Sequence, residues 1–259
     1  MNTPHCLRFL SVLALAFASA SIQADGDLPG ARSLVDAHIE ASGGRAALAR
    51  QMDSTTTGRF VMAAAGMEGQ MTLYSRMPTE RAIVIDIPNI GRIQSGYKDG
   101  QAWSMDPFMG PRLISGSELA MQTESNEFGA LMRTPEFVES MQTTGATEYN
   151  GEPCYEVEVV WKSGRESSDC YSTDTGLLLA SEGSMESPMG VMETTTVFSD
   201  YRTFKSNGLE VTLPASTEVT TMGQQQQLII DSIELGAPAD ENFQLPPAIE
   251  TLMADAETN

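Results

Sequence analysis

Residues 153–161 read PCYEVEVVW, a stretch in which apolar and acidic side chains alternate. Successive side chains of a β-strand point to opposite faces, so this pattern predicts a strand with one buried and one solvated face. The buried face would carry Tyr155, Val157, Val159 and Trp161. A strand with one solvent-exposed face is typical of an antiparallel sheet.

The same alternation recurs along most of the chain, and Gly, Pro, Asn and Asp separate the alternating segments. Further strands are expected around residues 60–62, 71–73, 83–87, 93–97, 102–105, 177–179, 191–202, 209–221 and 224–235. Roughly ten strands joined by short turns form a meander, and a meander of this length curls. The concave face of a curled sheet needs a cover.

Two segments have helical spacing and are available as that cover. ARSLVDAHIEASGG, residues 31–44, places Leu34, Val35, His38 and Ile39 on one helical face. In the middle of the chain, residues 114–133 fit one or two short helices. The predicted fold is mainly β (α+β): a curled antiparallel sheet forming an unclosed half-barrel, covered by the N-terminal helix and the short central helices.

The N-terminal residues have the layout of a secretory signal peptide. Arg8 precedes the apolar run 9–18, which is too short to span a membrane, and Ala18-Ser19-Ala20 suits a signal peptidase. We expect a signal peptide over residues 1–20, with cleavage as late as residue 24, and a periplasmic protein. A single domain is expected over residues 25–246, followed by an acidic, flexible tail over residues 247–259.

The charge and the scarcity of histidine exclude several classes of function. Without the leader the chain has 14 basic and 35 acidic residues, a balance that repels nucleic acid. His38 is then the one histidine left, and a lone histidine is more often a packing or capping residue than a ligand. No metal site, cofactor or catalytic residue is predicted, so an enzyme is not expected.

Asp174-Thr175-Gly176 could be read as the catalytic motif of an aspartic protease. Such an enzyme needs two of these motifs to share a proton, and the chain contains one. The three residues also stand between two expected strands, where Asp and Gly are usual turn residues. We interpret the motif as a turn.

Cys154 and Cys170 are the two cysteines beyond the leader, and they flank the turn-forming stretch KSGRES. In an oxidising compartment an isolated pair is more often bridged than free, so a disulfide is expected.

Methionine is unusually frequent, with 16 residues, many of them in the half that contains the central helices. Methionine fills irregular cores, but it also lines surfaces that accept varied apolar ligands. Both interpretations remain open, and the clustering favours a binding cavity.

Several short motifs resemble those of LolA-like proteins, the periplasmic outer-membrane lipoprotein-sorting and carrier superfamily. The motifs are YSRMPTERAIV (74–84), YKDGQAWSMDP (97–107), NGEPCYEVEVV (150–160) and YSTDTGLLL (171–179). The resemblance covers most of residues 30–246 and implies an unclosed barrel whose helices cover an apolar cavity for acyl chains. It also implies a lid-holding arginine, either Arg76, which Met77 separates from the proline, or Arg81.

We therefore expect a monomeric periplasmic carrier that binds lipid or lipoprotein acyl chains for transport toward the outer membrane. Inner- and outer-membrane delivery proteins would be its partners. The expected cavity residues are Phe60, Met62, Met71, Leu73, Ile85, Trp103, Met105, Leu119, Phe128 and Met132, and Trp103 fluorescence should respond to bound lipid. The alternative is an envelope-stress sensor or protein-binding module with the same fold, a packed interior and no transport role.

Overall fold

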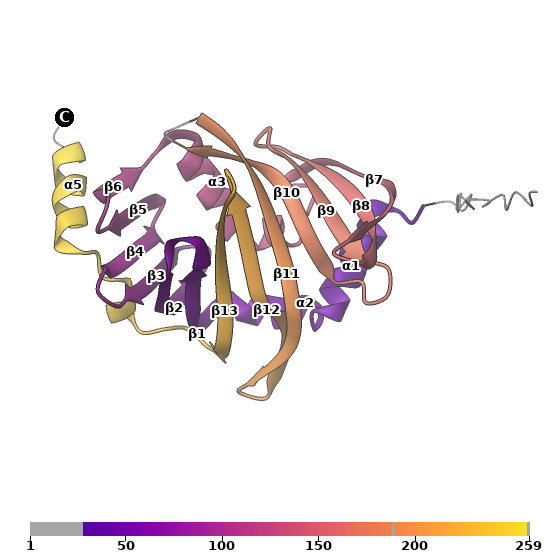
Figure 1. Cartoon of the computed structure of the whole chain (residues 1–259), viewed down its shortest axis with the longest axis horizontal. Helices are drawn as coiled ribbons and strands as arrows, with labels where there is room; N and C mark the ends of the chain where they lie inside the picture. The colour runs from indigo at the N-terminus through magenta and orange to yellow at the C-terminus, as the bar shows by residue number, and fades with distance from the viewer. Residues whose placement is uncertain (1–27, 188–189, 258–259) are drawn as a thin grey trace, which may run out of the picture.

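The computed structural model describes residues 28–187 and 190–257, so the predicted signal peptide lies outside the described residues. Thirteen strands in this part of the chain form one antiparallel sheet in the order β6-β5-β4-β3-β2-β1-β13-β12-β11-β10-β9-β8-β7 (Figure 1). The strands are β1 Asp53–Met62, β2 Met67–Arg76, β3 Glu80–Ile87, β4 Gly91–Lys98, β5 Gln101–Asp106, β6 Gly110–Ile114, β7 Val138–Tyr149, β8 Glu152–Trp161, β9 Glu166–Ser172, β10 Leu178–Ser187, β11 Gly190–Ser206, β12 Leu209–Thr221 and β13 Gln224–Leu235. The helices are α1 Ala31–Ala41, α2 Gly44–Gln51, η1 Ala63–Ala65, α3 Gly116–Asn126, α4 Phe128–Leu131, η2 Asp240–Phe243 and α5 Pro247–Glu257.

The sheet consists of two meanders that meet where β1 pairs with β13. We call β1–β6 the first wing and β7–β13 the second wing. The edge strands are β6 and β7, and they follow one another in the chain. The segment between them, which contains α3 and α4, therefore has to cross from one edge of the sheet to the other. This confirms the predicted fold class: one antiparallel sheet, not closed into a barrel, with a few helices.

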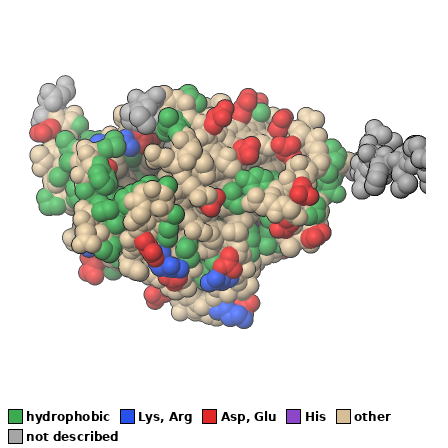
Figure 2. All heavy atoms as spheres, viewed as in Figure 1, with side chains coloured by type: hydrophobic (Ala, Val, Ile, Leu, Met, Phe, Trp, Pro, Cys, Tyr) green, Lys and Arg blue, Asp and Glu red, His purple; other side chains and the backbone are tan. Residues whose placement is uncertain are grey.

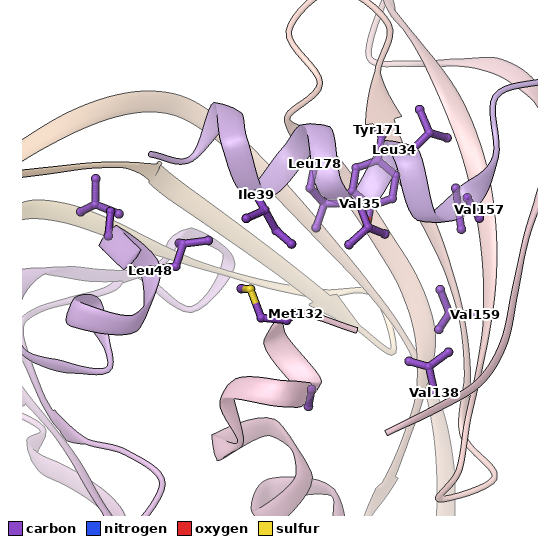
Figure 3. Packing of buried hydrophobic residues seen from close by; sticks show 14 of the residues in the cluster. Leu34, Val35, Ile39, Leu48, Met132, Val138, Val157, Val159, Tyr171 and Leu178 are labelled. Atoms are coloured by element: carbon purple, nitrogen blue, oxygen red, sulfur yellow. The ribbon is translucent and has the colours of Figure 1, made fainter. Parts of the chain in front are cut away.

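The main core lies between the helices and the second wing. Helix α1 buries Leu34, Val35 and Ile39 because residues at this spacing share one face of a helix. Figure 3 shows these side chains directed toward Tyr171 and Leu178 of the sheet. Val157 and Val159, predicted to face inward, are buried in the same cluster.

Two predicted local features of the second wing are confirmed. Cys154 and Cys170 form a disulfide that joins the neighbouring strands β8 and β9, with 5.6 Å between their Cα atoms. Asp174-Thr175-Gly176 is the turn between β9 and β10, closed by the Gly176 amide, which donates to the Ser172 carbonyl at 3.0 Å.

The C-terminal segment differs from the sequence-based expectation. Where an acidic, flexible tail is expected from residue 247, the chain forms α5 beside β6, and Ile249 is fully buried. Just before it, Phe243 lies under the Arg76 guanidinium, 4.8 Å from the ring centroid, and the same guanidinium binds the Pro238 carbonyl. In the sequence, acidic residues such as Glu250 are interspersed with the few apolar residues that pack against the sheet, so the segment reads as an exposed tail.

Candidate functional site: the inner face of the first wing and its helical cover

The register of β2, β3 and β4 places one set of side chains on the face that α3 covers, which we call the inner face. Leu119 of α3 packs against the cluster that contains Tyr97, and Tyr97 pairs with Arg81 across β4 and β3. Because side chains alternate, Arg81, Ile83, Ile85 and Ile87 all lie on this inner face.

An apolar stripe occupies most of that face. Its buried members are Phe60, Met71, Ile85 and Ile87, and partly accessible residues pack around them: Met62, Met67, Ile83, Ile90, Ile93 and Leu228. The stripe results from β-branched and methionine side chains at alternate positions of paired strands. Because several of its members are only partly buried, the stripe offers apolar surface that solvent or a ligand can reach.

Five of the ten expected cavity residues lie together on the inner face of the first wing. Four belong to the stripe, and Leu73 pairs directly with Ile83. A sixth, Leu119, packs onto the same face from α3. The residues brought together by the sheet are Phe60, Met62, Met71, Leu73 and Ile85.

The other four expected residues lie elsewhere. Met132 is 1% exposed in the main core of the second wing, and Phe128 packs against the same cluster. Ala102 belongs to the inner-face cluster with Tyr97 and Ile114, so the alternation along β5 puts Trp103 and Met105 on the outer face. The Trp103 ring packs over Gly96, where an added Cβ would be 2.7 Å from the ring.

Arg76 and Arg81, the two residues suggested to hold the helical lid, point to opposite faces of the sheet. Arg76 forms ion pairs with Glu80 and Asp240 and thereby binds the C-terminal segment on the outer face. Arg81 faces the cover helix from β3, but its guanidinium makes no hydrogen bond to the helix among the described residues. Among the described residues, neither arginine forms an ion pair or a side-chain hydrogen bond with α3.

Two other ion pairs hold the cover helix, one near each end, and we call them the lid clasp. Arg112 of β6 binds Glu118 through two hydrogen bonds of 2.8 and 2.9 Å. Arg165, in the β8–β9 turn, binds Glu124 at 3.0 Å. The rest of α3 is only partly covered: Leu119 packs onto the inner face, and Asn126 is the one buried residue of the helix.

The sequence contains almost no signal for the lid clasp. Arg112 and Glu118 are close in sequence, but nothing marks them as partners before β6 and α3 are known. Arg165 and Glu124 are 41 residues apart. Their contact exists because the chain between β6 and β7 crosses the open side of the sheet.

Trp161 lies beside one end of the lid clasp. The Arg165 guanidinium is 4.1 Å from the centroid of its indole ring, and the indole N–H donates to Ser167 Oγ at 3.1 Å. Because the stacked arginine also binds Glu124, opening of α3 would change the surroundings of Trp161. Trp161 is therefore a suitable optical probe of the position of α3.

A buried charge pair anchors the chain where α4 ends. Arg133 binds Asp169 through Nε at 2.9 Å and Nη2 at 2.5 Å, and Ser181 and Tyr171 donate hydroxyl protons to the same carboxylate. Burial works against the charged form of Arg133, but Asp169 outweighs it, so the pKa of Arg133 is raised. Burial raises the pKa of Tyr171. Arg133 and Tyr171 therefore keep their protons near neutral pH, and the network has a structural role.

His38 completes this network as a capping residue, as the sequence suggests. Its Nδ1 accepts a hydrogen bond from the Leu178 backbone N–H at 3.3 Å, and its ring lies 5.8 Å from that of Tyr171. Burial, with the nearby Arg133 charge, lowers the pKa of His38 from 6.5 to about 4. The imidazole is therefore neutral and acts as an acceptor.

The outer face of the second wing is hollowed and acidic. A shallow pocket of about 560 Å³ is lined by Glu158, Glu166, Glu182 and Glu193, with Ser and Thr between them. Figure 2 shows acidic side chains gathered over this wing.

Within residues 28–187 and 190–257, no group of three or more His, Cys, Asp or Glu is arranged to hold a metal ion. No helix in that part of the chain is long and apolar enough to cross a membrane.

Comparison with solved structures identifies the fold. A LolA superfamily protein from Nitrosomonas europaea superimposes with a TM-score of 0.50 at 14% identity, covering 84% of this chain and 99% of that one. A domain from Vibrio parahaemolyticus, named for outer membrane lipoprotein sorting, gives a TM-score of 0.49 at 13% identity over 80% of this chain and 96% of that one. No protein-family model and no curated protein sequence matches the chain. The chain has a LolA-like fold.

Proposed function

We propose that this chain is a periplasmic carrier that binds an acyl chain of a lipid or lipoprotein on the apolar stripe, beneath α3. The observation that carries the proposal is the combination of partly accessible apolar surface with a loosely packed cover. Helix α3 buries one residue and contributes none to the main core, so it can move without disrupting that core. The LolA-like fold and the predicted signal peptide support the same function.

Binding and release would need no bond-making chemistry. Each buried CH₂ contributes about 0.8 kcal/mol, so a long acyl chain gains appreciable affinity from the stripe alone. Arg112–Glu118 is bidentate and partly buried, so it is worth more than an exposed ion pair, on the order of 1–3 kcal/mol. A membrane-bound delivery partner that competes for the lid clasp would therefore have to offset a few kcal/mol, comparable to the burial of several CH₂ groups.

The experiment is a titration of the mature protein with a long-chain amphiphile, followed by the fluorescence of Trp161. A Trp103→Phe background removes the signal of the outer-face tryptophan. We expect a saturable change in emission as ligand binding to the stripe moves α3. An emission that stays constant while equilibrium dialysis also detects no bound amphiphile would refute the proposal.

Two adjacent residues provide a matched pair of variants. Ile83 faces the stripe and Val84 faces outward on the same strand, and both are partly accessible. Ile83→Asn should weaken amphiphile binding about tenfold or more, because a polar amide replaces apolar contact surface. Val84→Asn should leave binding unchanged; equal losses would show that the stripe is not the binding surface.

A protein-binding module with the same fold remains the second candidate. The observation that favours it is the inner face of the second wing, which α1, α2 and α4 fill with buried side chains such as Val35, Leu48 and Met132. Because described side chains fill most of that half of the sheet, function there would lie on the surface. Failure of amphiphile uptake in the titration above would favour this candidate.

A further inference from the structure

Arg81 is distinguished from other cations by what surrounds it. It lies on the inner face of β3, and its side chain opens into a pocket of about 280 Å³ between β3, β4 and α3. The side chain is accessible from the pocket although protein atoms surround it, and burial lowers the pKa of its guanidinium. Arginine nevertheless stays protonated at neutral pH, so the pocket contains a positive charge.

The guanidinium of Arg81 has no partner in the described part of the chain. Acidic residues greatly outnumber basic ones, and ten of the described lysines and arginines form ion pairs. The other described cations without an ion pair are Arg45 and Arg50 on α2 and Lys162 in a turn. Arg81 is the one of these four that lines the inner-face pocket.

The remaining walls of this pocket are neutral and rich in hydrogen-bonding groups. They are Ile83, Ser95, Gly96, Tyr97, Gln122, Ser125 and Asn126, and no carboxylate is among them. Asn126 is 2% exposed, and within the described residues its side-chain amide makes no hydrogen bond. Asn126 and Arg81 both line this pocket, so a ligand there can use the hydrogen-bonding capacity of both side chains.

The pocket is continuous with the apolar stripe. Arg81, Ile83, Ile85 and Ile87 follow one another on the inner face of β3. At a rise of about 3.3 Å per residue, Arg81 and Ile87 are roughly 20 Å apart along the strand. One charged end and one long apolar stretch match an amphiphile with a single anionic head.

We propose that Arg81, assisted by Asn126, binds the anionic oxygen atoms of an amphiphile whose hydrocarbon chain lies along the stripe. This inference rests on the proposed function and specifies its ligand class: a carboxylate or phosphate head with a long tail. Guanidinium suits both heads because its N–H groups match two oxygen atoms at once.

The test measures binding of dodecanoate, dodecyl phosphate and neutral dodecanol below their micelle concentrations, at about pH 8, where a carboxyl group is ionised. The proteins are the mature Trp103→Phe form and its Arg81→Gln and Arg45→Gln variants. Arg45→Gln removes the same charge from an exposed position on α2. Acetate and inorganic phosphate serve as anions without a tail.

We expect the parent to bind the two anionic amphiphiles on the order of tenfold to a hundredfold more tightly than dodecanol, the range for a hydrogen bond to a charged group. Arg81→Gln should abolish that preference and leave dodecanol affinity unchanged, and Arg45→Gln should preserve it. The stronger of the two anionic ligands identifies the head as carboxylate or phosphate. An unchanged circular dichroism melt shows that Arg81→Gln is folded.

The failures of the two proposals are distinguishable. Equal binding of dodecanol and the anions, or a preference that survives Arg81→Gln, overturns the role of Arg81 while the carrier proposal stands. If acetate or inorganic phosphate binds as tightly as the amphiphiles, the hydrocarbon tail does not contribute, and the proposal of one site for head and tail is wrong. If none of the three amphiphiles binds, the carrier function itself fails.

Discussion

His38 gives the structure a pH dependence that can be calculated. In the folded chain its Nδ1 accepts the Leu178 N–H while burial and Arg133 oppose a positive charge, so its pKa falls from 6.5 to about 4. A proton therefore binds the unfolded state first as pH falls. His38 stabilises the fold above about pH 6.5, and this stabilisation is lost progressively as the pH falls toward 4.

The size of the effect follows from the two pKa values. One pKa unit corresponds to 1.36 kcal/mol, so the shift from 6.5 to about 4 is worth about 3 kcal/mol of unfolding free energy. His38→Asn places a neutral acceptor near the position of Nδ1 and removes the titration. The parent should lose about 3 kcal/mol more than the variant between about pH 7 and pH 4.

Two measurements check this value. Urea unfolding of parent and variant across the pH range gives the difference directly, and comparison with the variant cancels the carboxylates that titrate in both proteins. His38 is the one histidine beyond the predicted signal peptide, so its imidazole proton resonance in the mature protein can be followed without ambiguity. A resonance midpoint near 6.5, or parallel loss of stability in both proteins, would refute the reasoning.

Three further predictions concern stability. Asp169→Asn should cost about 3–5 kcal/mol in urea unfolding, because it leaves a buried guanidinium without its carboxylate; a loss below about 1 kcal/mol would contradict this. Replacing Cys154 and Cys170 by serine opens a loop of sequence separation 16 and should lower unfolding free energy by about 3 kcal/mol, whereas parent and variant should be equally stable in reductant. Gly96→Ala should cost about 1–3 kcal/mol and alter Trp103 emission, because the added Cβ meets the indole ring; an unchanged melt would argue against that packing.

The sequence by itself determined the fold class and several local features. Alternation such as that from Tyr155 to Trp161 is a direct consequence of strand geometry, so it could be read before any tertiary contact was known. The helix over 31–41, the turn at Asp174 and the pairing of Cys154 with Cys170 depend on near neighbours or on composition. These predictions are confirmed for that reason.

Which face each strand turns inward was decided only by the tertiary structure. Ala102 and Trp103 are neighbours that are both buried, and the sequence favours the larger one as the cavity residue, yet the small alanine faces inward and the indole faces out. Alternation defines two faces but does not say which one a distant segment will cover. The lid clasp and the open pocket at Arg81 arise the same way, because the edges β6 and β7 are consecutive in the chain and α3 must bridge them. Contacts between residues far apart in sequence leave no local signal, so only the folded structure shows which residues meet.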